Sequence, residues 1–183
     1  MNKKNIIILV VVVIVIGGIV WLLATGAIPS PKTQEGTGTP QGTAVAPGTS
    51  AVTEEGQVVT QTGEPVKLDV EPGTPEAPQQ SNPVSPEDLP SSAIELTMTS
   101  SGITPNSFEV RSGDAVTVSV TAGDSQTHVF KFDDASLSAV AVGVGPGETR
   151  AITFNAPAKG SYGFHCDVPG HAGRGETGTM TVK

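Results

Sequence analysis

Cysteine and aromatic residues are scarce in this chain. Its 183 residues contain one cysteine, Cys166, and aromatic residues make up 4% of the sequence. A single cysteine cannot form a disulfide within the chain, and an unpaired thiol outside the cytoplasm tends to oxidise or to pair with another molecule. Ligation by a metal protects such a thiol. Cys166 is therefore a candidate functional residue.

Positive charge is also in short supply. Ten Lys and Arg residues face 18 Asp and Glu residues, which gives a net charge of −8 at pH 7. This balance argues against nucleic-acid binding, which depends on clustered basic residues. The glycine-rich stretches 143–147 and 173–178 contain no lysine and begin no predicted helix. They therefore lack the features of a phosphate-binding loop.

Residues 93–183 show no sustained helical period of 3.6. Apolar and polar residues alternate instead, as in 94–98 and 116–120, and turn residues recur about every 8–12 residues, as in antiparallel sandwiches. About 91 residues suffice for one core. We therefore predict an all-β, Greek-key β-sandwich over residues 93–183. The expected strands lie near 94–98, 108–110, 116–120, 128–132, 139–142, 150–154, 162–164 and 178–182.

Residues 6–24 form a long uncharged run near the N-terminus. As a helix this run is roughly 28 Å long, close to the thickness of a bilayer core. Lys3 and Lys4 favour a cytoplasmic N-terminus. We predict a transmembrane anchor within residues 1–28, single-pass in the cell membrane, with the rest of the chain extracytoplasmic. Small residues at 24–27 leave a cleavable signal as the alternative, in which case the protein is secreted.

Residues 29–92 differ in composition from both neighbours. They hold eleven of the fifteen prolines and nine acidic residues against two lysines. Such a segment buries too little apolar surface to offset the entropy of ordering, which predicts a disordered linker. Two valine-containing stretches, 58–59 and 66–70, could pair locally but have no core nearby. As a flexible coil, the 64 residues would reach roughly 40–50 Å.

Three residues could converge on one ion. His128 begins a predicted strand, Cys166 ends a later one, and His171 follows Cys166 across a Pro-Gly turn. A thiolate with two imidazoles favours copper in both of its oxidation states. The rival use is a Cys-His nucleophile, which needs an orienting group and an oxyanion hole, often at a helix N-terminus. No such helix is evident, which disfavours enzyme chemistry.

Residues 156–171 carry a resemblance to a known family. This run, Ala-Pro-Ala-Lys-Gly-Ser-Tyr-Gly-Phe-His-Cys-Asp-Val-Pro-Gly-His, resembles the ligand loop of the cupredoxins, the small blue-copper proteins. Thr104-Pro105, Val110, Gly113-Asp114, Val116 and His128 resemble the first half of the family pattern. The resemblance covers nearly all of 93–183. It implies one copper ion per chain at the loop-rich end of the sandwich, with His128, Cys166 and His171 as in-plane ligands.

The chain departs from the family pattern at Glu176. Cupredoxins with this type of loop usually place an axial methionine five residues after the second histidine, where this chain has Glu176. Met180 lies in an alternating strand and is expected in the core. An axial carboxylate would stabilise Cu(II), lower the reduction potential and shift absorption away from blue, as in red or green copper sites. Alternatively, Glu176 points to solvent, and the axial position is empty or held by a backbone carbonyl.

These features predict a membrane-tethered, extracytoplasmic mononuclear copper protein that acts as a one-electron carrier and not as an enzyme. Its partner would be a redox protein such as a cytochrome or a membrane oxidoreductase. The chain would be a monomer, attached to the membrane through its N-terminal helix. The alternative is a copper-binding or storage module, or a small-molecule sensor with a carboxylate-bound copper. A third reading is an adhesion or assembly domain that has lost its metal.

Overall fold

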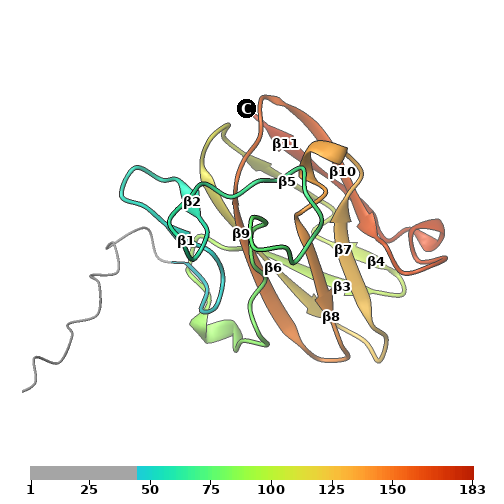
Figure 1. The fold of residues 1–183 in the computed structure, drawn as a ribbon. Coiled ribbons are helices and arrows are strands. Elements are labelled where there is room, and N and C mark those ends of the chain that lie inside the picture. The colour runs from blue at the N-terminus through green and yellow to red at the C-terminus, as the bar shows by residue number, and fades with distance from the viewer. Residues whose placement is uncertain (1–44) are drawn as a thin grey trace, which may run out of the picture. The chain divides into compact units, whose positions relative to one another are not determined.

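The computed structural model describes residues 45–183 (Figure 1). Three short 3-10 helices interrupt the strands in this part of the chain: η1 (Pro86–Asp88), η2 (Ala135–Leu137) and η3 (Ala172–Arg174). Within residues 45–183, no helix has the length and apolar character needed to cross a membrane. The predicted anchor, centred on residues 6–24, lies outside the described residues.

Two sheets form a β-sandwich, which confirms the all-β prediction. The five-stranded sheet has the order β5-β11-β10-β7-β8, and the four-stranded sheet has the order β4-β3-β6-β9. The first comprises β5 (Ser107–Val110), β7 (His128–Phe132), β8 (Ala141–Val144), β10 (Gly160–Cys166) and β11 (Thr177–Val182). The second comprises β3 (Ile94–Thr99), β4 (Gly102–Thr104), β6 (Ala115–Ala122) and β9 (Thr149–Asn155).

The chain alternates between the two sheets, and two strand pairs are parallel. After the β7–β8 hairpin the chain crosses to the other sheet as β9 and returns as β10 beside β7, as in Greek-key connections. Most pairs are antiparallel, as expected, but β3 pairs with β6 and β5 pairs with β11 in parallel. These parallel pairs join strands from separate parts of the chain, so local alternation does not reveal them.

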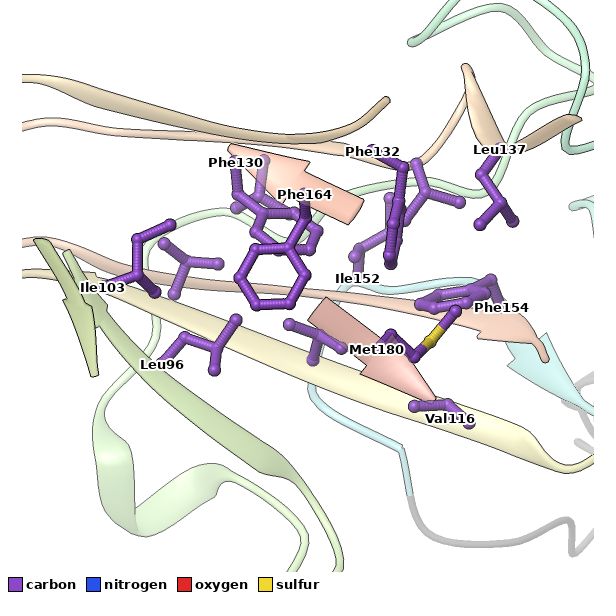
Figure 2. Packing of buried hydrophobic residues seen from close by; sticks show 14 of the residues in the cluster. Leu96, Ile103, Val116, Phe130, Phe132, Leu137, Ile152, Phe154, Phe164 and Met180 are labelled. Atoms are coloured by element: carbon purple, nitrogen blue, oxygen red, sulfur yellow. The ribbon is translucent and has the colours of Figure 1, made fainter. Parts of the chain in front are cut away.

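The core lies between the sheets and extends toward one end of the sandwich. Phe130, Phe132 and Phe164 pack with ring centroids 5.2–6.1 Å apart, and Figure 2 shows them directed toward Leu96 and the other labelled core residues. Burial of each such side chain contributes about 1.5–3 kcal/mol. Alternate residues of a strand share a face, so Cys166 points inward like Phe164 two residues earlier. The aromatic cluster thus continues directly into the cysteine.

Residues 45–92 are in contact with the sandwich, whereas the sequence predicts a disordered linker over 29–92. They include a hairpin of β1 (Ala51–Val52) and β2 (Val58–Val59), and they run beside β9 (Figure 1). The Ser81 amide donates to the Ala151 carbonyl at 2.8 Å, and the Val84 amide donates to the Thr149 carbonyl at 2.9 Å. We call residues 45–92 the strap.

The strap covers edge strands of both sheets. β8 and β9 are edge strands, and the Gly143 amide of β8 donates to Gln80 of the strap at 3.1 Å. On β9, Asn155 accepts from the Val58 amide at 2.8 Å and donates to the Gly56 carbonyl at 2.8 Å. Pairing of exposed edge groups blocks association with other strands. Val58 and Val59 thus pair locally with β1 and also contact β9, which lies nearly 100 residues further along the chain.

Candidate metal centre

Antiparallel pairing of β7 and β10 brings the first two site residues to the same end of the sandwich. Cys166, the last residue of β10, lies opposite Phe130, and His128 begins β7 two residues earlier. Since alternate residues share a face, His128 and Phe130 both point inward with Cys166. The Val129 amide donates to the Cys166 sulfur with a distance of 3.4 Å, which ties the two strands together at the site.

A tight loop returns His171 to the cysteine. The Asp167 amide donates to the Val129 carbonyl at 2.8 Å, and the His171 amide donates to the Val168 carbonyl at 3.0 Å. Gly170 closes this turn with a φ of 84°, a conformation that side chains with a Cβ rarely adopt. The predicted Pro-Gly turn between Cys166 and His171 is thereby confirmed.

A second left-handed glycine brings Glu176 into the same cluster. Helix η3 ends at Gly175, whose φ is 100°, and the chain then reverses into β11. The Glu176 carbonyl accepts from the Cys166 amide at 3.0 Å, so the two residues are backbone neighbours. Glu176 has 0% of its surface exposed, and Met180 is fully buried in the core. The alternative in which Glu176 points to solvent is therefore wrong, and the core position expected for Met180 is confirmed.

Four potential ligand atoms converge in a buried cluster. One atom each from His128, Cys166, His171 and Glu176 lies within 4.8 Å of all the others. Glu176 Oε2 is 2.8 Å from His128 Nδ1 and 3.0 Å from His171 Nδ1. The Cys166 sulfur is 3.8 Å from His128 Nδ1 and 3.5 Å from His171 Nδ1. All four predicted site residues are thus brought together, and we call them the four-residue cluster.

The two acidic members of the cluster have pKa values shifted in opposite directions. Burial raises the pKa of the Cys166 thiol, although amide donors from Val129 and Val168 oppose the effect. Burial also acts to raise the pKa of Glu176, but hydrogen bonds from surrounding groups, His128 first among them, outweigh it and lower the pKa overall. Glu176 is therefore a carboxylate at neutral pH, while the thiol needs a metal ion to displace its proton.

Arg174 holds the Glu176 carboxylate in a single orientation. Its Nη2 donates to Glu176 Oε1 at 3.1 Å and to Gln126 Oε1 at 3.2 Å. With Oε1 engaged by Arg174, Oε2 is directed at the two histidines. The guanidinium also supplies a positive charge to a carboxylate whose burial would otherwise be costly. The sequence pattern alone does not mark Arg174 as part of the site, although it lies only two residues before Glu176.

Asp124 is a second residue that the sequence reading did not identify as part of the site. Its Oδ1 is 3.0 Å from His128 Nε2, on the side of the ring opposite the cluster. A carboxylate four residues before a candidate ligand histidine is a signal that could have found it. His165, by contrast, lies outside the cluster and contacts Asp133 and Asp167, because successive side chains of a strand point to opposite faces and Cys166 points inward.

The donor set fits copper. A soft thiolate and two imidazoles suit copper in both oxidation states, and the carboxylate adds a harder donor that favours Cu(II). The distances between donor atoms are short enough for a single ion. His128, Cys166 and His171 would hold the ion, with Glu176 as the fourth donor.

Comparisons with known proteins agree with this chemistry. The sequence model of the cupredoxin-like domain matches residues 78–182, more than half of the chain. Over 86 residues, 40% are identical to chloroplastic plastocyanin of Oryza sativa subsp. indica, covering 43% of this chain and 53% of that protein. Plastocyanin of Vicia faba is 34% identical over 87 residues, covering 43% of this chain and 84% of that protein.

A solved structure is similar to about half of this chain. Reduced auracyanin of Roseiflexus castenholzii matches with a TM-score of 0.46 and 26% identity, covering 51% of this chain and 98% of that one. The chain spans about half the length of the first curated relatives that it matches. The family match extends upstream of the predicted boundary at residue 93, into the strap. By its sequence match and its buried His, Cys, His and Glu cluster, the chain belongs to the cupredoxin family of copper proteins, with copper, one ion per chain, as its cofactor.

Proposed function

We propose that this protein is a one-electron carrier and not an enzyme. The observation that carries the proposal is the preformed, buried cluster of His128, Cys166, His171 and Glu176. Bound copper supplies a one-electron couple between Cu(I) and Cu(II). The cluster is held by strand pairing, by two glycine turns and by the aromatic core, so its donors need move little when the charge of the ion changes.

His171 is the proposed route for electrons to leave the site. It is 7% exposed, whereas the other three members of the cluster are at most 1% exposed. Ala172 and Gly173 follow it, and small side chains allow close approach of a partner. The net charge of −8 favours a partner with a basic docking surface, such as a cytochrome or a membrane oxidoreductase. The protein would act as a monomer in transient encounters.

The location of this activity is also part of the proposal. A transmembrane helix within residues 1–28 would anchor the protein in the cell membrane and place the copper domain on the extracytoplasmic side. Attachment to the membrane would raise the local concentration of the copper domain near membrane-bound partners.

Copper loading of the full chain tests the proposed function. We expect one copper per chain, an intense thiolate-to-Cu(II) absorption, and fast reduction by a small basic c-type cytochrome followed by stopped-flow spectroscopy. Cys166→Ser should abolish the absorption while leaving the fold intact, as judged by circular dichroism. Binding of zinc in preference to copper, or failure to bind copper, would overturn the proposal.

One feature supports a second candidate, a copper-storage or small-molecule-sensing module with a carboxylate-bound copper. The fully buried Glu176 carboxylate lies where the family usually has a methionine. A carboxylate favours Cu(II) and can push the potential out of the range that a carrier uses. Reversible copper binding with no electron exchange with the cytochrome would favour this candidate. Fast electron exchange would favour the carrier.

A further inference from the structure

Asp124 contacts the one ring nitrogen of His128 that faces away from the four-residue cluster. It lies in the loop between β6 and β7, and its side chain is 23% exposed. Its Oδ1 is 3.0 Å from His128 Nε2, while His128 Nδ1 faces Cys166 and Glu176. The histidine ring is therefore held between a carboxylate on one side and the donor cluster on the other.

The Asp124 carboxylate is fixed in place by the backbone. Its Oδ2 accepts from the Ser100 amide at 2.7 Å, and its Oδ1 accepts from the Gln126 amide at 2.9 Å. Gln126 in turn accepts from Arg174, so the same loop is linked to both charged neighbours of the cluster. These bonds come from two separate parts of the chain. Asp124 is thus held in place by the backbone, and its contact with Nε2 limits rotation of the His128 ring.

We infer that Asp124 is a positioning residue, which keeps the Nε2–H of His128 engaged so that Nδ1 is presented to copper. This inference rests on the proposed copper site. A neutral imidazole carries one N–H, and two carboxylates face the His128 ring, Asp124 at Nε2 and Glu176 at Nδ1. With the N–H on Nε2 and donated to Asp124, it is Nδ1 that can bind metal. Carboxylate partners of ligand histidines also increase the basicity of the ring. The negative charge of Asp124 therefore adds to that of Glu176 in favouring Cu(II) over Cu(I).

Two variants separate geometry from charge. Asp124→Asn can keep the acceptor oxygen toward His128 and Gln126 but removes the charge and the bond from the Ser100 amide, whereas Asp124→Ala removes every contact of the side chain. Asp114→Asn is the matched control, because Asp114 is an exposed turn residue whose loss makes the same change in net charge. The full chain is used throughout. Cu(II) and Cu(I) affinities are measured by chelator competition, and the reduction potential is measured by titration.

We expect Asp124→Ala to weaken copper binding by about 10–100-fold, the usual cost of removing such a partner. Asp124→Asn should weaken Cu(II) binding more than Cu(I) binding, and each tenfold difference corresponds to a potential rise of about 59 mV. Copper affinities within twofold of the wild type, together with an unchanged reduction potential, in both variants would overturn the inference. If Asp124→Ala fails to fold, Asp124→Asn decides the outcome alone.

A measurement without copper separates this inference from the proposed function. In the metal-free wild type, nitrogen-edited NMR should show a slowly exchanging Nε2–H proton on His128. Exchange should be at least tenfold faster in Asp124→Ala and unchanged in Asp114→Asn. Slow exchange retained in Asp124→Ala would contradict the inference, even if copper binds. If the wild type fails to bind copper but the exchange result holds, the proposed function fails while the positioning role of Asp124 stands.

Discussion

Replacement of Glu176 by glutamine tests how strongly this carboxylate would control the copper site. Glutamine has nearly the same shape, so Glu176→Gln removes the charge with little change in packing. Glu176 Oε2 lies 2.8 and 3.0 Å from the two histidine Nδ1 atoms, so the carboxylate is adjacent to any ion that they hold. Loss of this negative charge should destabilise Cu(II) relative to Cu(I) and raise the reduction potential.

Coulomb's law gives an order of magnitude for the rise. Two unit charges about 4 Å apart interact by roughly 4 kcal/mol at an effective dielectric constant of about 20, equivalent to about 170 mV for one electron. Arg174, which is 44% exposed, loses its charged partner in the variant. If its side chain turns to solvent, its own positive contribution to the potential is lost as well. We therefore expect a net rise between about 60 and 170 mV.

Protein-film voltammetry and visible and electron paramagnetic resonance spectra of the copper-loaded chain measure this effect. Glu148→Gln is a matched control, because Glu148 also pairs with an arginine two residues away, Arg150, but lies outside the four-residue cluster. Glu176→Met should raise the potential as well and shift the spectrum toward blue. A potential and a spectrum that do not change in Glu176→Gln would refute a role for Glu176 as the fourth donor.

Three further predictions concern the protein without copper. Because burial raises the pKa of Cys166, less thiolate is present at a given pH, and alkylation by iodoacetamide at pH 8 should be at least about tenfold slower than in urea, where the ordinary value of about 8.5 applies. Equal rates would contradict this. Asn155→Ala should lower the free energy of unfolding by roughly 2–3 kcal/mol, since several hydrogen bonds to the strap are lost, and should speed proteolysis within 45–92. Urea unfolding and limited proteolysis measure both, and unchanged cleavage would show that the strap is held by other contacts. Phe164→Ala should cost about 3–5 kcal/mol in urea unfolding, since it opens a cavity beneath the site, and a loss below about 1 kcal/mol would contradict the packing described.

The strands of the sandwich could be predicted because each carries its own signal. Alternation in 94–98 reflects one buried and one exposed face of β3, whereas both faces of β6 are buried at 116–120, where the polar side chains Thr117 and Ser119 alternate with the core valines. The parallel pairing of β3 with β6 could not be predicted, because it depends on which strands meet in space. The four-residue cluster could be predicted because three of its members, Cys166, His171 and Glu176, lie close together in the sequence.

The strap and the charged neighbours of the cluster were missed for a common reason. In the sequence, Val58 and Val59 look like isolated apolar residues in a proline-rich segment. Besides β1, they contact β9, which lies far along the chain. Asp124 and Arg174 lie in polar loops, where charged residues are normally solvated. Their contacts with His128 and Glu176 form only after the fold brings the loops together. Long-range polar contacts of this kind leave no periodic pattern in the sequence.

The charges around the cluster make a further prediction for Arg174. With Cys166 as a thiolate and Glu176 ionised, Cu(II) gives a neutral set, whereas Cu(I) leaves one negative charge in a buried environment. Arg174, 3.1 Å from Glu176, offsets part of that charge and so favours Cu(I). Arg174→Gln should therefore lower the potential, opposite in sign to Glu176→Gln.

The decrease should be smaller than the rise in Glu176→Gln, because Arg174 is 44% exposed and solvent screens its charge. Voltammetry of Arg174→Gln beside Arg150→Gln, its counterpart in the distant pair, measures the difference. A rise in potential would show that Arg174 acts mainly by holding Glu176 against the ion, since its loss would then release the carboxylate. The sign of this one change thus decides whether the arginine works through its charge or through the position that it gives to Glu176.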